Sequence, residues 1–360
     1  SQDLITLPHS TLDIIPSGPP LGRLVTQRGS GDRSLYFVDA GKKYRIPWNE
    51  MVEAMNWRGS VVSDVSSQLF NLTSISHDMT YAIKNKSTAT KYIIDGRDGS
   101  GQTIIRPFSS DTVMAAWENE VSNVTEVSDD YFNSIDNSIG SPINTTRISY
   151  NSQDYEIYAS RRMLLGGDVK DLFPTQSVQI NANTFQRFAP WSNMTHLVKS
   201  TTAPEVYLMD MGKKQHLPNS NTLNAWSANK SITLVNQYFI DLLPQTARVD
   251  TYAGEGSGGQ IYILTGDKKI PVPSSLATSY RAAFNPRLTS QQLLNLFITG
   301  SNATPYVTYQ SNIMNGFLID NLGKKRSFSS NQLRSLIVNN SYKTALPDNI
   351  VDSITSGTII

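Results

Sequence analysis

Lysine pairs at four turns are the first candidates in this chain for binding a ligand. They follow or adjoin glycines in "DAGKK", "DMGKK", "TGDKK" and "NLGKK", and they are Lys42/Lys43, Lys213/Lys214, Lys268/Lys269 and Lys324/Lys325. Four such pairs on one face would form a basic rim suited to an anionic cell-wall polymer. The competing interpretation is that lysines at turns and strand edges keep sheets soluble and discourage pairing between edges.

A second candidate site lies in "DGRDGSGQ", residues 95–102. Asp95, Asp98 and Ser100 would supply oxygen ligands to a calcium ion in a glycine-rich loop. The loop lacks the usual downstream bidentate glutamate and replaces the lysine turn of the other copies. An enlarged hairpin is therefore the alternative. Calcium is the one cofactor that the sequence suggests.

Other chemistry finds little support. The four histidines, His9, His77, His196 and His216, are far apart and lack zinc-ligand spacing. The sequence contains no phosphate-binding loop. The serine in "GEGSG" (254–258) precedes a strand, not the helix of a nucleophile elbow. We predict no catalytic residue and no enzymatic activity.

The tryptophans divide into two groups. Trp57, Trp117 and Trp226 end the same helix in three copies of a repeat, which predicts a packing role. Trp48 and Trp191 fall outside that register, so we predict that they are exposed ligand-binding candidates.

These residues are positioned by a repeat. "VYLMDMGKKQHLPNSNTLNAW" (206–226) has counterparts throughout the chain. Each contains a short strand, an alternating strand, a turn, a third strand, a capped helix and a second apolar cluster. Residues 1–21 resemble the end of such a repeat. We predict six units, at residues 22–75, 76–143, 144–193, 194–245, 246–303 and 304–360.

Short strands with one helix per unit predict a mostly β fold. We expect a six-unit, β-propeller-like ring with a helical insertion in each blade. An open, solenoid-like stack is the alternative. The sequence does not distinguish a natural N-terminus from a cut within a longer array.

Composition narrows the setting of the protein. The chain has no cysteine, 17% charged residues and a net charge of +1. This balance argues against nucleic-acid binding, and no apolar run predicts membrane insertion. A cysteine-free, weakly charged, Ser/Thr/Asn-rich chain is typical of bacterial exported proteins, so we expect a secreted or cell-surface location.

The repeat also resembles a known type. Val206–Pro218 and Thr222–Leu223, continued through Leu234–Val235 and Leu242–Pro244, are similar to degenerate GKK-type tandem repeats of bacterial secreted and cell-surface proteins, often found beside cell-wall hydrolase modules. The resemblance implies a non-catalytic module that binds a cell-wall polymer, a glycan or a surface protein multivalently. A structural display scaffold and a carbohydrate-active enzyme are the alternatives.

Overall fold

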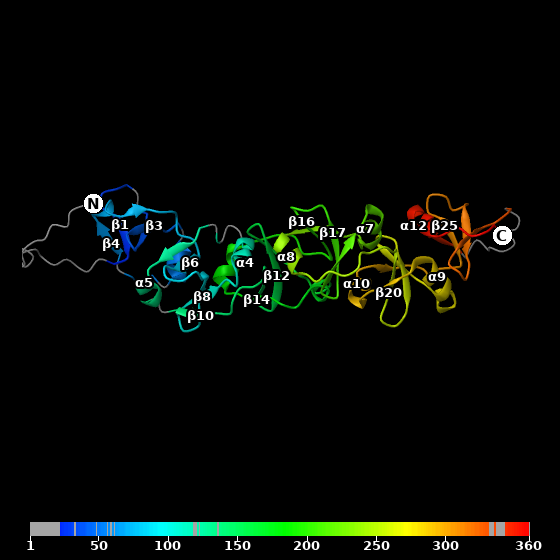
Figure 1. Ribbon diagram of the computed structural model, residues 1–360, viewed down its shortest axis with the longest axis horizontal. Helices are drawn as coiled ribbons and strands as arrows, with labels where there is room; N and C mark the ends of the chain where they lie inside the picture. Colours follow the sequence, from blue (N-terminus) through cyan, green and yellow to red (C-terminus); the bar gives the residue numbers. More distant parts are fainter. Residues whose placement is uncertain are drawn as a thin grey trace, which may run out of the picture. The chain divides into compact units, whose positions relative to one another are not determined.

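The chain folds into two compact bodies in the computed structural model (Figure 1). Of the described residues, one body comprises those up to residue 108 together with 121–141, and the other comprises 109–117 and those from 142 onward. The structure describes residues 22–31, 34–47, 49–55, 57, 60, 62–117, 121, 123–134, 137–330, 335 and 343–359. The predicted N-terminal segment 1–21 and Trp48 lie outside the described residues.

Each of the six predicted ranges contains one separate sheet of four or five strands. Three consecutive strands form an antiparallel meander. A fourth strand then adds in parallel beside the first, and a fifth adds in parallel beside the third. Parallel neighbours require a crossover connection, and short helices before the fourth and fifth strands provide it. We call these the first and second helix of a unit.

Units 1 and 2 show the complete pattern. Unit 1 consists of β1 (Leu24–Gln27), β2 (Tyr36–Asp39), β3 (Lys42–Arg45), α2 (Asn49–Ala54), β4 (Val62–Val65), α3 (Ser67–Phe70) and β5 (Ser74–Ile75). Unit 2 consists of β6 (Ala82–Asn85), β7 (Lys91–Arg97), β8 (Thr103–Pro107), α4 (Asp111–Ala116), β9 (Thr125–Val127), α5 (Asp129–Ser134) and β10 (Asn137–Ile139).

Units 3 and 4 follow the same order. Unit 3 consists of β11 (Arg147–Tyr150), β12 (Gln153–Tyr158), β13 (Arg161–Leu164), η2 (Lys170–Leu172), β14 (Val178–Gln179), α6 (Ala182–Arg187) and β15 (Ala189–Pro190). Unit 4 consists of β16 (Leu197–Ser200), β17 (Val206–Asp210), β18 (Lys213–Leu217), α7 (Ser220–Trp226), β19 (Thr233–Val235) and α8 (Gln237–Leu242).

Units 5 and 6 complete the described chain. Unit 5 consists of β20 (Ala253–Glu255), β21 (Ile261–Leu264), β22 (Lys268–Pro271), η3 (Ser274–Leu276), α9 (Ala277–Phe284), β23 (Arg287–Leu288), α10 (Gln291–Asn295) and β24 (Ile298–Thr299). Unit 6 consists of β25 (Tyr306–Tyr309), β26 (Gly316–Ile319), β27 (Lys325–Ser327), β28 (Thr344–Leu346) and α12 (Asp348–Ser353). In units 4 and 6 a single parallel bridge, at Gln245 or Ser356, replaces the fifth strand.

The expected propeller-like ring is wrong, although the mostly β composition is confirmed. Blades of a propeller are antiparallel sheets arranged around a channel. Here the outer strands run parallel to their neighbours, and each described sheet takes all its strands from one stretch of sequence. In a closed ring, the last blade would include a strand from the N-terminal part of the chain. The last sheet here, β25 to β28, includes no such strand among the described residues. The second helix of each unit was not predicted from the sequence. It lies in the stretch that was described from the sequence only as a second apolar cluster.

The turn between the second and third strands also joins consecutive units. The backbone N–H of Gly212 donates to Leu172 O (3.0 Å), and that of Gly266 donates to Ala225 O (3.1 Å). In each pair the acceptor belongs to the first helix of the preceding unit. A Cβ on Gly323 would lie 2.3 Å from the backbone nitrogen of Ala283 in α9. Glycine is therefore needed for close approach as well as for its positive φ.

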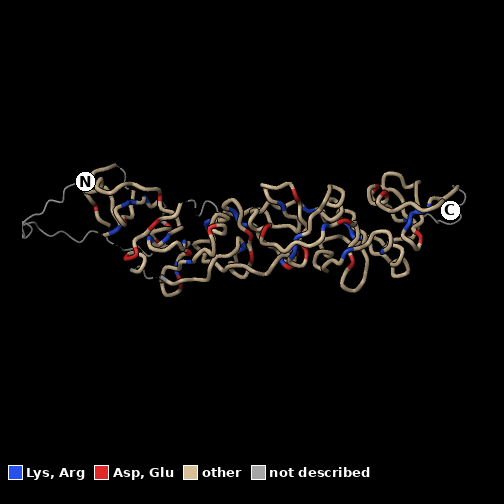
Figure 2. Tube along the Cα trace, in the orientation of Figure 1, with Lys and Arg blue, Asp and Glu red and all other residues tan. Residues whose placement is uncertain are grey.

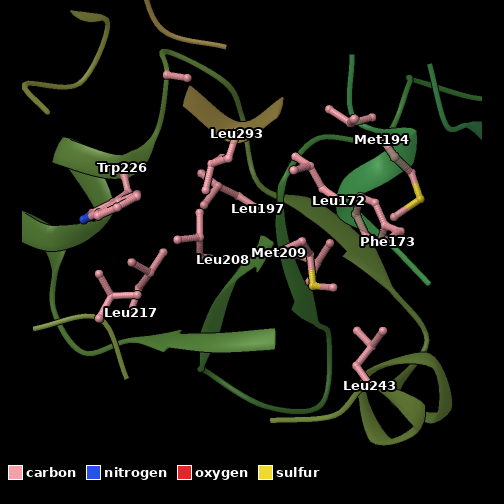
Figure 3. Close-up of a cluster of buried hydrophobic side chains, with 14 of the residues drawn as sticks. Leu172, Phe173, Met194, Leu197, Leu208, Met209, Leu217, Trp226, Leu243 and Leu293 are labelled. Atoms are coloured by element: carbon pink, nitrogen blue, oxygen red, sulfur yellow. The ribbon is translucent and has the colours of Figure 1, made fainter. Parts of the chain in front are cut away.

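The core of the second body continues through consecutive units (Figure 3). Leu172 of unit 3, Leu208 and Trp226 of unit 4, and Leu293 of unit 5 belong to one buried cluster. Sharing a core in this way is typical of repeat proteins, in which each unit buries its apolar face against its neighbours.

The three tryptophans at the helix ends are buried, which confirms their predicted packing role. Trp57, Trp117 and Trp226 are between 0 and 8% exposed. The indole N–H of Trp226 also donates to Thr251 O of the next unit (2.8 Å). Trp117 repeats this bond with Thr145 O (3.2 Å). Aromatic packing and a buried hydrogen bond thus link successive units.

Candidate functional site

The second lysine of each pair is part of the fold. Its ammonium group donates to a carbonyl of the second helix of its own unit. The bonds are Lys43 to Phe70 O (2.6 Å), Lys214 to Ile240 O (2.7 Å), Lys269 to Leu294 O (2.7 Å) and Lys325 to Val351 O (3.0 Å). A cation is favourable at a helix C-terminus, where carbonyls lack intrahelical donors. Burial lowers the pKa of Lys43 and of Lys269.

The first lysine of each pair is exposed. Lys42, Lys213, Lys268 and Lys324 all lie at the start of a third strand or just before it. In units 2 and 3 the buried position holds Ile105 and Arg162 instead. A basic rim would therefore consist of at most one lysine per pair. Figure 2 shows acidic residues interspersed with the basic ones along the described chain.

The calcium candidates have other contacts. Asp95 is fully buried and pairs with Arg106 (Oδ2 to Nε, 2.6 Å). Asp98 accepts from the hydroxyl and the backbone N–H of Ser100 and from the N–H of Gln102, at 2.7–2.9 Å. These bonds lower the pKa of Asp98, the Ser100 hydroxyl most of all. Over the described ranges, no group of three or more acidic or histidine side chains is placed to hold a metal ion.

Trp191 lies at the surface of unit 3 beside the partly buried Tyr158. It follows β15 and remains 38% exposed. Its ring and that of Tyr158 are nearly parallel, with an interplanar angle of 17° and centroids 6.2 Å apart. The guanidinium carbon of Arg161 lies 5.0 Å from the Trp191 ring centroid. We call Tyr158, Arg161 and Trp191 the aromatic platform.

The platform occupies the turn position that carries glycine and lysine elsewhere. Tyr158 and Arg161 flank Ala159 and Ser160, which have φ of 50° and 57°. Two residues other than glycine in the left-handed region cost on the order of 1 kcal/mol each. The Tyr158 hydroxyl is held by Thr201 Oγ1 (3.2 Å). Among the described residues, Arg161 has no carboxylate partner.

A cleft of about 410 Å³ lies between units 4 and 5, within the second body. Unit 4 contributes Gln215 of β18. Unit 5 contributes residues 246–251, which follow α8, together with the end of α9 and β23. The lining residues are Gln215, Thr246, Ala247, Arg248, Asp250, Thr251, Phe284, Asn285, Arg287 and Leu288. The volume falls in the range of small-ligand sites.

Two buried titratable groups lie outside both features. Burial raises the pKa of Glu156 to about 8 and lowers the pKa of His196 to about 4. Glu156 occupies a strand position that is apolar in the other five units, for example Leu208 in unit 4. Both groups are therefore uncharged near pH 7. Because their pKa values differ from those in the unfolded chain, they make the stability of the fold depend on pH.

Of the three platform residues, Trp191 alone was predicted from the sequence to have a ligand-binding role. No such role was predicted for any residue of the cleft. Trp191 stood out because it breaks the repeat register. Tyr158 and Arg161 had a detectable signal, since "YASR" replaces the aspartate, glycine and lysine of "DMGK". Gln215 and Asn285 had none, because a cleft between two units leaves no pattern in either.

Comparisons with known proteins add a distant structural likeness. No family model and no curated protein matches the chain. A structure of the periplasmic assembly from the ESX-5 inner membrane complex is similar at 11% identity and a TM-score of 0.15, covering 81% of this chain and 94% of that one. An intact ESX-5 inner membrane complex matches at 10% identity and a TM-score of 0.17, covering 97% and 82%. TM-scores this low do not indicate a shared fold. Along the described chain, no helix is long and apolar enough to cross a membrane.

Proposed function

We propose that the protein is a non-catalytic module of the bacterial cell envelope that binds an acidic glycan on the aromatic platform. The observation that carries this proposal is the exposed ring of Trp191, nearly parallel to the partly buried ring of Tyr158 and beside the cationic Arg161. The residues repeated between units are used for folding. Ligand recognition therefore falls to residues that differ between units.

The chemistry of the platform suits an acidic sugar. The face of an aromatic ring is electronegative, so it attracts the polarised C–H groups on the flat side of a pyranose. A guanidinium group binds a carboxylate with two parallel hydrogen bonds. The exposed lysines of the turns would add a weak attraction that salt screens. Glycan binding here depends on shape and on one strong charge contact.

Isothermal titration calorimetry with the full chain tests the proposal. The probes are tetragalacturonate, which is acidic, and maltotetraose, which is neutral. We expect Trp191→Ala to weaken tetragalacturonate binding at least tenfold. We expect Arg161→Gln to reduce the preference for the acidic probe. Ile298→Ala, which removes a more exposed apolar side chain elsewhere (64% exposed, against 38% for Trp191), is the control and should bind normally.

Three results would overturn the proposal. The first is absence of tetragalacturonate binding by the unaltered chain. The second is equal binding by Trp191→Ala and the unaltered chain. The third is release of new reducing ends during incubation, which would indicate glycoside hydrolysis and favour the carbohydrate-active alternative.

A further inference from the structure

We infer that the cleft between units 4 and 5 is a second binding site, specific for a neutral saccharide. It shares no residue with the aromatic platform. The inference therefore stands on separate observations, and it holds or fails independently of the proposed function.

The first observation is the side chain of Gln215. It is only 7% exposed and it lines the cleft. Among the described residues, its amide has no hydrogen-bond partner. The amide atoms are not fully enclosed, so they open into the cleft and can pair with a molecule bound there. The equivalent side chain of unit 1, Tyr44, reaches Glu126 O of the following unit (3.2 Å). An amide left open at the same place is positioned for a bound molecule.

The second observation is the charge of the cleft. Arg248 pairs with Asp250 (2.7 Å), and Arg287 pairs with Asp210 (3.1 Å). Each guanidinium group therefore already has a carboxylate, and the cleft presents no excess charge to an anion. A neutral ligand avoids separating either pair.

The third observation is the mixture of lining groups. Gln215, Asn285 and Thr246 can each donate and accept hydrogen bonds. Phe284 and the exposed Leu288 supply apolar surface. A neutral sugar has hydroxyl groups around its rim and C–H groups on its faces, so it matches both kinds of surface. Asn285 is fixed in the left-handed region, with φ of 43°, where it ends α9.

The test is titration of the full chain with maltotetraose and cellotetraose, followed by calorimetry and by the side-chain amide signals of Gln215 in NMR spectra. We expect at least one neutral probe to bind and to shift the Gln215 signals. Gln215→Leu keeps the size of the side chain and removes the amide. We expect it to weaken binding at least tenfold while folding normally, because no internal hydrogen bond is lost.

Controls separate this site from the platform. Gln292→Leu, at an exposed glutamine of α10 outside the cleft, should bind the neutral probe normally, and so should Trp191→Ala. The inference is overturned if neither neutral probe binds. It is also overturned if binding leaves the Gln215 signals unchanged, or if Gln215→Leu binds as tightly as the unaltered chain.

Discussion

Substituting Lys214 tests an interaction that recurs in four units, the hydrogen bond from the second lysine of a pair to the end of the second helix. Lys214 is 8% exposed, donates to Ile240 O at 2.7 Å, and lies 5.4 Å from the centroid of the Tyr207 ring. Lys214→Met keeps the length of the side chain and removes the charge. Lys213→Met, at the exposed neighbouring position, is the matched control.

The magnitude follows from these contacts. A hydrogen bond from a charged donor contributes about 1.5–3 kcal/mol, and losing it leaves the carbonyl of Ile240 with the backbone N–H of Leu243 (3.2 Å) as its remaining donor. The cation–π contact adds roughly 0.5–2 kcal/mol. Relief of the desolvation of the ammonium group opposes both. We expect a net loss of about 2 kcal/mol for Lys214→Met, and less than about 0.5 kcal/mol for Lys213→Met.

Hydrogen exchange measured by mass spectrometry provides the assay, because it reports local stability in a chain of several units. A loss of about 2 kcal/mol makes exchange about 30-fold faster in peptides covering α8. Peptides from α12 should be unchanged. Equal exchange in the two variants would refute the reasoning, as would slower exchange in Lys214→Met.

Three other predictions concern buried features of the fold. Burial raises the pKa of Glu156 to about 8 from an ordinary value of 4.5. Between these two pH values the folded state retains a proton that the unfolded state has lost. The contribution of Glu156 to the free energy of unfolding is therefore fully present below about pH 4.5 and falls by about 1.4 kcal/mol per pH unit up to about pH 8. Glu156→Gln should therefore flatten the dependence of urea midpoints on pH between 5 and 8, and a slope like that of the unaltered chain would contradict this. Trp226→Phe removes the bond to Thr251 O and should cost about 2–3 kcal/mol in urea unfolding, whereas a cost below about 0.5 kcal/mol would argue against linkage between units. Gly323→Ala should lower the melting temperature much more than Gly41→Ala, since φ is similar at both glycines (75° and 77°) but only Gly323 would place a Cβ against backbone; equal effects in calorimetry would show that close approach is unimportant.

Local elements of the fold were predictable from sequence, whereas its topology was not. Turn glycines and helix-capping residues such as Asn219 act over a few positions, so their pattern survives in each copy. The fifth strand, one of the two parallel outer strands, depends on the second helix. That helix spans only six residues in α8, too few for a clear helical period. In unit 3 the sequence "NANTF" resembles a first helix, but α6 occupies the place of the second.

The candidate sites divide in the same way. Burial of Trp226 followed from its repeated position, and the exposure of Trp191 followed from its departure from that register. The sequence did not distinguish the two lysines of a pair. Only the pairing of Lys214 with α8 shows which amine points inward. Asp95 likewise looked like a calcium ligand until its buried partner, Arg106, was placed beside it.

The central claim is that repeated residues hold the fold while residues of single units bind the ligand. The most direct measurement compares the tetragalacturonate affinity of two variants of the full chain. One is the double substitution Arg161→Gln with Trp191→Ala. The other replaces all four exposed lysines, at positions 42, 213, 268 and 324, by alanine. We predict that the platform variant loses binding and that the lysine variant changes affinity less than about threefold at 0.15 M salt. Loss of binding in the lysine variant, with normal binding in the platform variant, would contradict the claim.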